Sequence, residues 1–228
     1  MEEQFQREEM LIGEEGLAKL RRAHVLLLGL GGVGGGTLEA LARVGIGHLT
    51  LVDPDFVEES NLNRQLIAIH STVGMRKVDA ARARVLDIFP DCQVETRAVF
   101  YDAETAEEFD LAAYSYVADA IDTVTSKLLL AEKCAACGAR LISSMGTGNK
   151  ADPSLFRVSD VYDTAGDPLA RVIRRELRSR GVPKLTVVWS PEPNFVPPDG
   201  RTPGTFSFVP PVAGMVMAGK IVRDILDS

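Results

Sequence analysis

The sequence predicts an α/β protein, and three observations lead to this class. Short apolar runs alternate with helical patterns between residues 24 and 144, a glycine-rich turn closes the first run, and an acidic residue ends the second. Elements that alternate in this way build a Rossmann-like, mostly parallel sheet with helices on both faces. The 228 residues, of which 46% are hydrophobic, suit a single domain.

A helical arm and a strand–helix–strand unit open the chain. Apolar positions between residues 8 and 22 have the spacing of short helical pieces. The apolar run at 24–29 predicts a buried strand, and the glycines behind it lead into a helix at 33–44. A strand at 48–52 ends at Asp53 and completes the unit, for which a right-handed crossover is expected.

The same alternation continues through the middle of the chain. Pro90 stops the first helix of this part, and Gly138 ends the last one. Strands are predicted at 93–98, 114–119 and 140–144. Helices are predicted at 75–88 and 124–137, with a helical turn near 103–109.

The sequence pattern of alternating strands and helices changes after about residue 150. We therefore expect a core at 20–150 and a substrate-side extension at 151–228. The extension is predicted to hold strands at 155–159 and 184–189 and a helix at 168–180. Residues 190–205 contain five prolines and two glycines, which predicts a mobile loop. The final apolar run, from Val209 to Ile225, contains charged residues and is predicted to be a packed helix, not a transmembrane segment.

Charge and cysteine content narrow the class of function. A net charge of −7 argues against a protein that coats nucleic acid with its whole surface, and no DNA partner is expected. The first 24 residues carry no apolar leader, so a cytoplasmic protein is expected. Cys134 and Cys137 have the spacing of half a zinc site, but no second pair exists, so we expect packed helix cysteines and no structural zinc.

The glycine-rich turn Gly29-Leu-Gly-Gly-Val-Gly34 predicts a phosphate site. Such a turn between a strand and a helix presents backbone N–H groups at the positive end of the helix dipole, although a purely structural tight turn has the same sequence. The candidate contacts are Gly29, Gly31, Gly32 and Gly34. Asp53 stands at the position where an acidic residue binds the ribose hydroxyls in such folds, and Asp55 is a second candidate for ATP binding. At this point a nicotinamide dehydrogenase is still allowed.

A polar loop then favours ATP over a dinucleotide. It brings a guanidinium and three amides near the expected phosphates, and Lys77 adds a second cation at the start of the next helix. Ordinary surface charge is the competing interpretation. The loop residues are Asn61, Asn63, Arg64 and Gln65. Asp119 and Asp122 follow a strand at the ligand-binding edge of the sheet; Asp122 is a candidate for Mg²⁺ or for a helix N-cap.

One helix of the extension predicts a basic patch on this acidic chain. Residues 171–184 carry six basic groups and one acid. The arginines that share a helix face are Arg171, Arg174, Arg175 and Arg178. They are candidates for RNA phosphates, and a solvated helix face is the alternative. Lys150 faces either the substrate or the solvent.

The ordered motifs GLGGVG, TLVDPDFVEESNLNRQ, VGMRKVDAAR and VADAIDT resemble the ubiquitin-activating-type adenylation superfamily, which includes the ThiF and MoeB proteins. The resemblance covers residues 4–150 and implies a homodimer that adenylates a carboxylate with Mg-ATP. It implies that Gly31 and Gly32 approach the nucleotide and that Asp53 binds the ribose. It assigns Asn61, Arg64 and Lys77 to the phosphates and Asp122 to magnesium. Arg7 matches an arginine that reaches the partner subunit's ATP, although Gln4 stands where an earlier arginine is common.

The segments SYVADAID, LISSMGTGNKADPS and DPLARVIRRELRSRG resemble the branch of that superfamily that dehydrates threonylcarbamoyladenosine in tRNA. The resemblance implies that ATP activates the threonyl carboxylate and that the carbamoyl nitrogen then closes a ring. The resemblance also allows a monovalent cation as a cofactor and a cysteine-desulfurase or sulfur-acceptor system as a partner. The rival hypotheses are an enzyme that adenylates a ubiquitin-like sulfur carrier and an NAD-dependent oxidoreductase.

Overall fold

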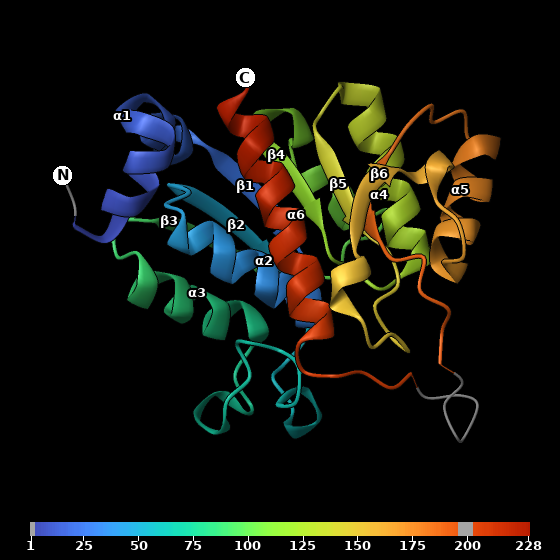
Figure 1. Ribbon diagram of the computed structural model, residues 1–228, viewed down its shortest axis with the longest axis horizontal. Helices are drawn as coiled ribbons and strands as arrows, with labels where there is room; N and C mark the ends of the chain where they lie inside the picture. The colour runs from blue at the N-terminus through green and yellow to red at the C-terminus, as the bar shows by residue number, and fades with distance from the viewer. Residues whose placement is uncertain (1–2, 196–202) are drawn as a thin grey trace.

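The protein is built on one seven-stranded sheet with the order β3-β2-β1-β4-β5-β7-β6 (Figure 1). The computed structural model describes residues 3–195 and 203–228. The strands are β1 (His24–Leu28), β2 (His48–Val52), β3 (Gln93–Arg97), β4 (Tyr116–Asp119), β5 (Leu141–Ser144), β6 (Arg157–Asp160) and β7 (Thr186–Trp189). Only the edge strand β6 is antiparallel to its neighbour. The predicted mostly parallel α/β sheet is therefore confirmed.

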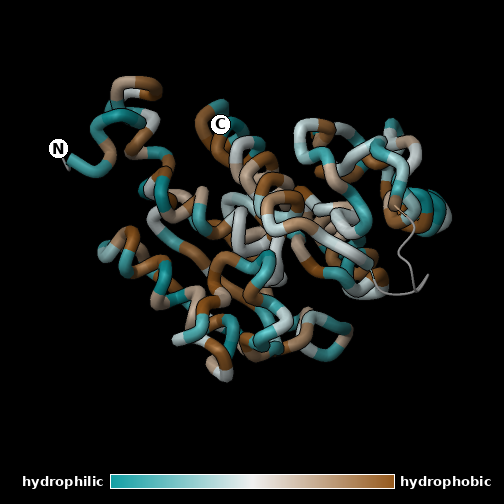
Figure 2. Tube along the Cα trace, turned by 60° about the horizontal axis from the view of Figure 1, so that its bottom comes forward, coloured by the Kyte–Doolittle hydropathy of each residue, from teal (hydrophilic) through white to brown (hydrophobic). Residues whose placement is uncertain are grey.

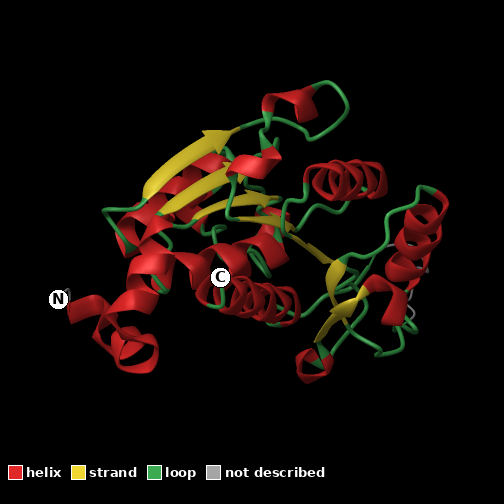
Figure 3. Ribbon diagram, turned by 90° about the horizontal axis from the view of Figure 1, so that it is seen from above, coloured by secondary structure: helices red, strands yellow, loops and turns green. Residues whose placement is uncertain are grey.

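Helices cover both faces of the sheet, as the view along its edge shows (Figure 3). In Figure 1, α2, α3 and α6 lie in front of the strands, while α4 and α5 lie on the other side. The α-helices are α1 (Gln6–Arg22), α2 (Gly32–Arg43), α3 (Lys77–Ile88), α4 (Val124–Cys137), α5 (Pro168–Ser179) and α6 (Val209–Leu226). Short 3₁₀ turns, such as those at Glu59–Asn61 and Thr105–Glu108, occur in the connections.

The observed elements follow the predicted ones closely, with local differences. The arm is one helix, α1, interrupted at Gly13, whose φ of 71° is outside the helical range. Within 190–205, residues 191–195 and 203–205 carry no regular structure, and the predicted mobility of 196–202 lies outside the described residues. Along residues 3–195 and 203–228, no helix is both long and apolar enough to cross a bilayer.

The main hydrophobic core includes residues from both ends of the chain. It joins Phe5 and Leu20 near the N-terminus to Met217, Ile221 and Ile225 of α6. Helix α6 approaches α2 closely because small residues face each other: a Cβ on Gly36 would lie 2.3 Å from the Pro211 carbonyl oxygen, and one on Gly214 would lie 2.1 Å from that of Val33. The C-terminal helix is thus part of the central packing.

Two histidines stack near the amino ends of β1 and β2. The rings of His24 and His48 are nearly parallel, with centroids 3.4 Å apart, and His24 Nε2 lies 2.8 Å from Thr50 Oγ1. Burial and the neighbouring His48 lower the pKa of His24 to about 4, while Glu95 acts in the opposite direction. The neutral imidazole is therefore the form that suits this packing.

We expect the free energy of unfolding to fall as the pH decreases from about 6.5 to about 4, because His24 takes up its proton more readily in the unfolded chain. His24→Gln should reduce this pH dependence, as measured by urea unfolding at several pH values. His70→Gln, which changes an exposed histidine, is the matched control. An unchanged pH profile in His24→Gln would contradict the assignment.

Candidate active site

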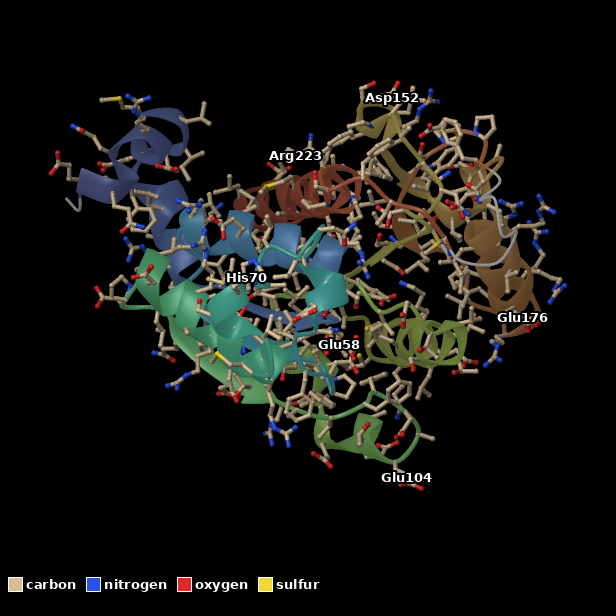
Figure 4. All side chains as sticks on the ribbon, turned by 90° about the horizontal axis from the view of Figure 1, so that it is seen from below. Glu58, His70, Glu104, Asp152, Glu176 and Arg223 are labelled. Atoms are coloured by element: carbon tan, nitrogen blue, oxygen red, sulfur yellow. The ribbon has the colours of Figure 1, made fainter. Side chains whose placement is uncertain are left out.

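A cleft of about 1060 Å³ opens at the carboxyl ends of the strands. It lies where β1 and β4, which are neighbours in the sheet, lead to helices on opposite faces, and this is where ligands bind in such sheets. Figure 4 views the molecule from this side, with Glu58 of the loop after β2 near the centre. One side of the cleft contains the predicted nucleotide residues, and the other contains residues 144–148 and 203–205.

The glycine turn contributes three of its four predicted contacts to the cleft. Gly29, Gly31 and Gly32 line it, whereas Gly34 does not. A Cβ on Gly34 would lie 1.8 Å from the Gly29 carbonyl oxygen, so Gly34 is required for the tightness of the turn. A Cβ on Gly31 would have Gln65 Nε2, at 3.9 Å, as its nearest heavy atom, so the backbone of Gly31 is open to a ligand. The predicted contact between Gly34 and ATP stays a prediction.

Asp53 connects the end of β2 to the glycine turn. Its side chain is almost fully buried; Oδ2 accepts a hydrogen bond from the Leu30 N–H at 2.7 Å, and Oδ1 accepts one from the Asp55 N–H at 2.9 Å. Lys77 Nζ lies 3.7 Å from Asp53 Oδ1 and donates to Asp55 Oδ2 at 2.7 Å. All three side chains line the cleft, where the predicted contacts with ATP require them to be.

The polar loop divides into residues that build it and residues that face the cleft. Asn61 is buried; its Oδ1 accepts from the Glu58 N–H and its Nδ2 donates to Ser60 Oγ, so it stabilises the loop and does not line the cleft. Its predicted contact with ATP stays a prediction. The residues that line the cleft are Asn63, Arg64 and Gln65.

Arg64 and Gln65 give this wall its polar character. Arg64 Nη1 donates to the Ser60 carbonyl oxygen and to Asn63 Oδ1, both at 2.8 Å, which orients the guanidinium. Gln65 is buried, and within the described part of the chain its Oε1 has no hydrogen-bond partner. A buried amide oxygen without a partner fits a ligand that donates a hydrogen bond at this wall.

Asp119 belongs to a buried network below the cleft. Its side chain is fully buried, with Oδ2 bonded to Lys127 Nζ at 3.1 Å and to Ser143 Oγ. Lys127 Nζ also donates to the Ser144 carbonyl oxygen at 2.8 Å. Asp119 does not line the cleft, and its predicted contact with ATP stays a prediction. Sequence reasoning missed Lys127, although a lysine among apolar residues of α4 was a visible signal.

Asp122 is exposed and lines the cleft. The N-cap of α4 is Thr123, without a side-chain capping bond, so the alternative role of Asp122 as that cap is wrong. Within residues 3–195 and 203–228, no group of three histidine, cysteine, aspartate or glutamate side chains can hold a metal ion. A single carboxylate together with substrate phosphates is nonetheless a usual Mg²⁺ environment, and Asp122 fits it.

The remaining candidates lie away from this wall. Arg7 is exposed on α1 and does not line the cleft of its own chain. Helix α5 exposes three arginines, Arg171, Arg175 and Arg178. Figure 4 labels Glu176 on the same helix, and in Figure 2 the trace of α5 alternates between hydrophilic teal and hydrophobic brown. Arg174 is half-buried because its Nη1 donates to both the carbonyl oxygen and Oγ1 of Thr164.

Lys150 faces neither the substrate nor the solvent. Its side chain is buried, and its ammonium donates to the carbonyl oxygens of Ser190 and Glu192 and to Asn194 Oδ1. A buried ammonium needs such partners, and residues 190–194 supply them. The predicted contact of Lys150 with tRNA is therefore a correction.

The two neighbouring cysteines differ in environment. Cys134 is buried in α4, and this burial raises its thiol pKa to about 12, as suits a packing role. Cys137 is exposed, which corrects the expectation that both cysteines are packed.

A doubly wound sheet whose cleft combines a glycine turn, a buried aspartate and two cations defines an α/β nucleotide-binding protein. The ThiF family model matches residues 5–228, and the chain belongs to the ThiF family. The tRNA threonylcarbamoyladenosine dehydratase of Bacillus subtilis is 43% identical over 98% of this chain and 94% of the relative, and that of Escherichia coli is 38% identical over 74% and 63%. The structure of E. coli TcdA in complex with ATP matches with a TM-score of 0.92 and 32% identity, over 98% of this chain and 94% of that one.

Gly34→Ala should destabilise the protein by about 1–3 kcal/mol or more, because the added methyl group would meet the Gly29 carbonyl oxygen. Gly31→Ala adds the same group where space exists, so it should fold normally while weakening nucleotide binding. Urea unfolding and ATP titration measure the two effects. Equal stability losses in the two variants would contradict this division of roles.

Lys127→Met should cost about 3–5 kcal/mol of unfolding free energy, because it leaves the Asp119 carboxylate buried without its cation. Lys133→Met breaks a more exposed pair with Glu107 and should cost less than about 1 kcal/mol. Chemical unfolding at pH 7 compares them. A similar small cost for both would show that the buried pair does not support the cleft.

Proposed function

We propose that this protein uses ATP to dehydrate threonylcarbamoyladenosine in tRNA. The observation that carries the proposal is the cleft wall, where the glycine turn, Asp53, Arg64, Lys77 and Asp122 face one space. The relative with 43% identity, which bears the name of that activity, supports this reaction over adenylation of a carrier protein. A nicotinamide oxidoreductase would leave Arg64 and Lys77 without a role.

The proposed reaction has two steps. A threonyl carboxylate oxygen attacks the α-phosphorus of ATP, and pyrophosphate leaves. The carbamoyl nitrogen then attacks the activated acyl carbon, loses its proton and displaces AMP, which closes the ring. The net change in the nucleoside is the loss of one water, and neither step requires an enzyme thioester.

The residues of the cleft suit the charges that develop in the first step. Arg64 and Lys77 stabilise negative charge on the departing pyrophosphate, and charge stabilisation of this kind is commonly a large contribution to catalysis. Asp53 binds the ribose from its position beside the glycine turn. Asp122 would hold Mg²⁺, which when bound supplies positive charge against the phosphates.

We assign the tRNA contact to the exposed arginines of α5. Arg171, Arg175 and Arg178 are suited to phosphate oxygens, although Arg175 pairs with Glu176 and Arg178 lies over the Tyr162 ring in the free protein. Arg174 has a more structural role because of its bonds to Thr164. The proposal places the reaction in the cytoplasm.

We further propose a homodimer in which Arg7 reaches the partner's ATP. Support comes from the position of Arg7 away from its own cleft and from the nearby side chains of Met10 and Leu11, which are 78% and 85% exposed. Exposed apolar side chains of this size suit contact with a second copy. A monovalent cation and a sulfur-acceptor partner are retained as predictions of the resemblance alone.

Arg64→Ala should lower turnover by about 10²–10³-fold while leaving the thermal midpoint unchanged, because it removes charge stabilisation without emptying the core. The measurement is incubation with ATP and modified tRNA, followed by nucleoside mass. The wild-type protein should remove one water from the modified nucleoside.

Arg82→Ala, on the exposed side of α3, is the control and should retain full turnover. Retained turnover in Arg64→Ala would overturn the role of Arg64. Pyrophosphate exchange that requires a Gly-Gly-ended protein and ignores tRNA would overturn the proposed function itself.

A further inference from the structure

Two exposed phenylalanines lie directly beside the cleft. Pro203, Gly204 and Thr205 line the cleft, and the chain continues through Phe206 and Phe208 into α6. In Figure 1 this segment is the orange-red stretch at the lower right that leads to the start of α6. The two side chains are 56% and 47% exposed, although phenylalanine is normally buried.

The two rings form a flat aromatic surface. Their planes differ by 5° and their centroids lie 5.4 Å apart, so they are stacked with an offset. Stacking on each other occupies one face of each ring. A flat, uncharged π surface of this kind is suited to another planar ring system.

The segment that carries the rings is held at both ends. Asn149 takes a left-handed conformation with a φ of 59°; its N–H donates to the Gly204 carbonyl oxygen and its Oδ1 accepts from the Gly204 N–H, both at 2.8 Å. On the other side of the rings, Val209 is fully buried, and Pro210 lies against Gly32 of the glycine turn. The rings therefore have a defined position relative to the glycine turn.

We propose that Phe206 and Phe208 form a stacking site for a nucleobase of the RNA next to the base that enters the cleft. This inference rests on the proposed function. An enzyme that works on one base removes it from the stack, and its neighbour then loses a stacking partner. Aromatic side chains replace that partner in many proteins that bind single-stranded RNA, and they do so with little dependence on sequence.

A second copy of this chain is the other class of partner that an exposed apolar pair suggests. The position of the two rings favours RNA, because Phe206 directly follows Thr205, which lines the cleft. Because the proposed homodimer also brings the N-terminal arm of a second copy to this cleft, self-association is the competing explanation for the exposed rings. Oligomeric state is therefore an outcome of the test.

A direct binding test uses Phe208→Trp. Trp189 is the only native tryptophan and is buried, so the wild-type protein reports the background. Modified tRNA added at fixed ionic strength should quench the new fluorescence, because a base stacks on the indole. Absence of quenching although the tRNA is bound would overturn the site.

The functional test compares Phe206→Leu/Phe208→Leu with Phe206→Tyr/Phe208→Tyr. The leucine pair keeps apolar bulk without a π face and should raise the Kd and KM for modified tRNA by roughly tenfold, within the range for base–aromatic stacking. The KM for ATP should change less than about twofold. The tyrosine pair should bind tRNA as the wild type does.

Unchanged tRNA affinity in the leucine pair would overturn the proposal, and a change in oligomeric state by sedimentation without loss of RNA affinity would assign the rings to a contact between copies. The proposed function is checked separately by nucleoside mass with the wild-type protein. Quenching without loss of water would retain the stacking site and reject the dehydration.

Discussion

The buried carboxylate of Asp53 connects the glycine turn, the end of β2 and the start of α3, which together form one wall of the cleft. It accepts backbone hydrogen bonds from Leu30 in the glycine turn and from Asp55 after β2, and it lies close to Lys77 at the start of α3. A buried charge is stable only with such partners. The position of the turn, the end of β2 and the start of α3 are therefore fixed with respect to one another.

A second buried charge organises the opposite side of the cleft. Lys127 links the end of β4, through Asp119, to the Ser144 carbonyl oxygen at the end of β5. Ser144 begins the stretch 144–148 that lines the cleft opposite the glycine turn, and Asn149 beyond it accepts a hydrogen bond from the Gly204 N–H. One buried ion pair therefore stabilises the part of the cleft around the glycine turn, and the other stabilises the strand ends below it.

The C-terminal helix connects these walls to the rest of the molecule. Pro210 and Pro211 approach Gly32 and Gly36 of α2, so the start of α6 contacts the beginning of the helix that follows the glycine turn. The same segment carries the stacked rings of Phe206 and Phe208. The proposed nucleotide and RNA sites are therefore connected by the contact between α2 and α6.

The sequence by itself determined the alternation of strands and helices, the glycine turn, and the grouping of Asp53, Arg64 and Lys77, because these are local patterns with a fixed place in a parallel sheet. Only the tertiary structure decided which polar side chains face the cleft. Asn61, Asp119 and Lys150 have the residue types of ligand contacts, but their burial makes each the internal partner of another polar group. Burial depends on packing between distant segments, such as Lys150 with residues 190–194 and α6 with α2, and no local pattern records that.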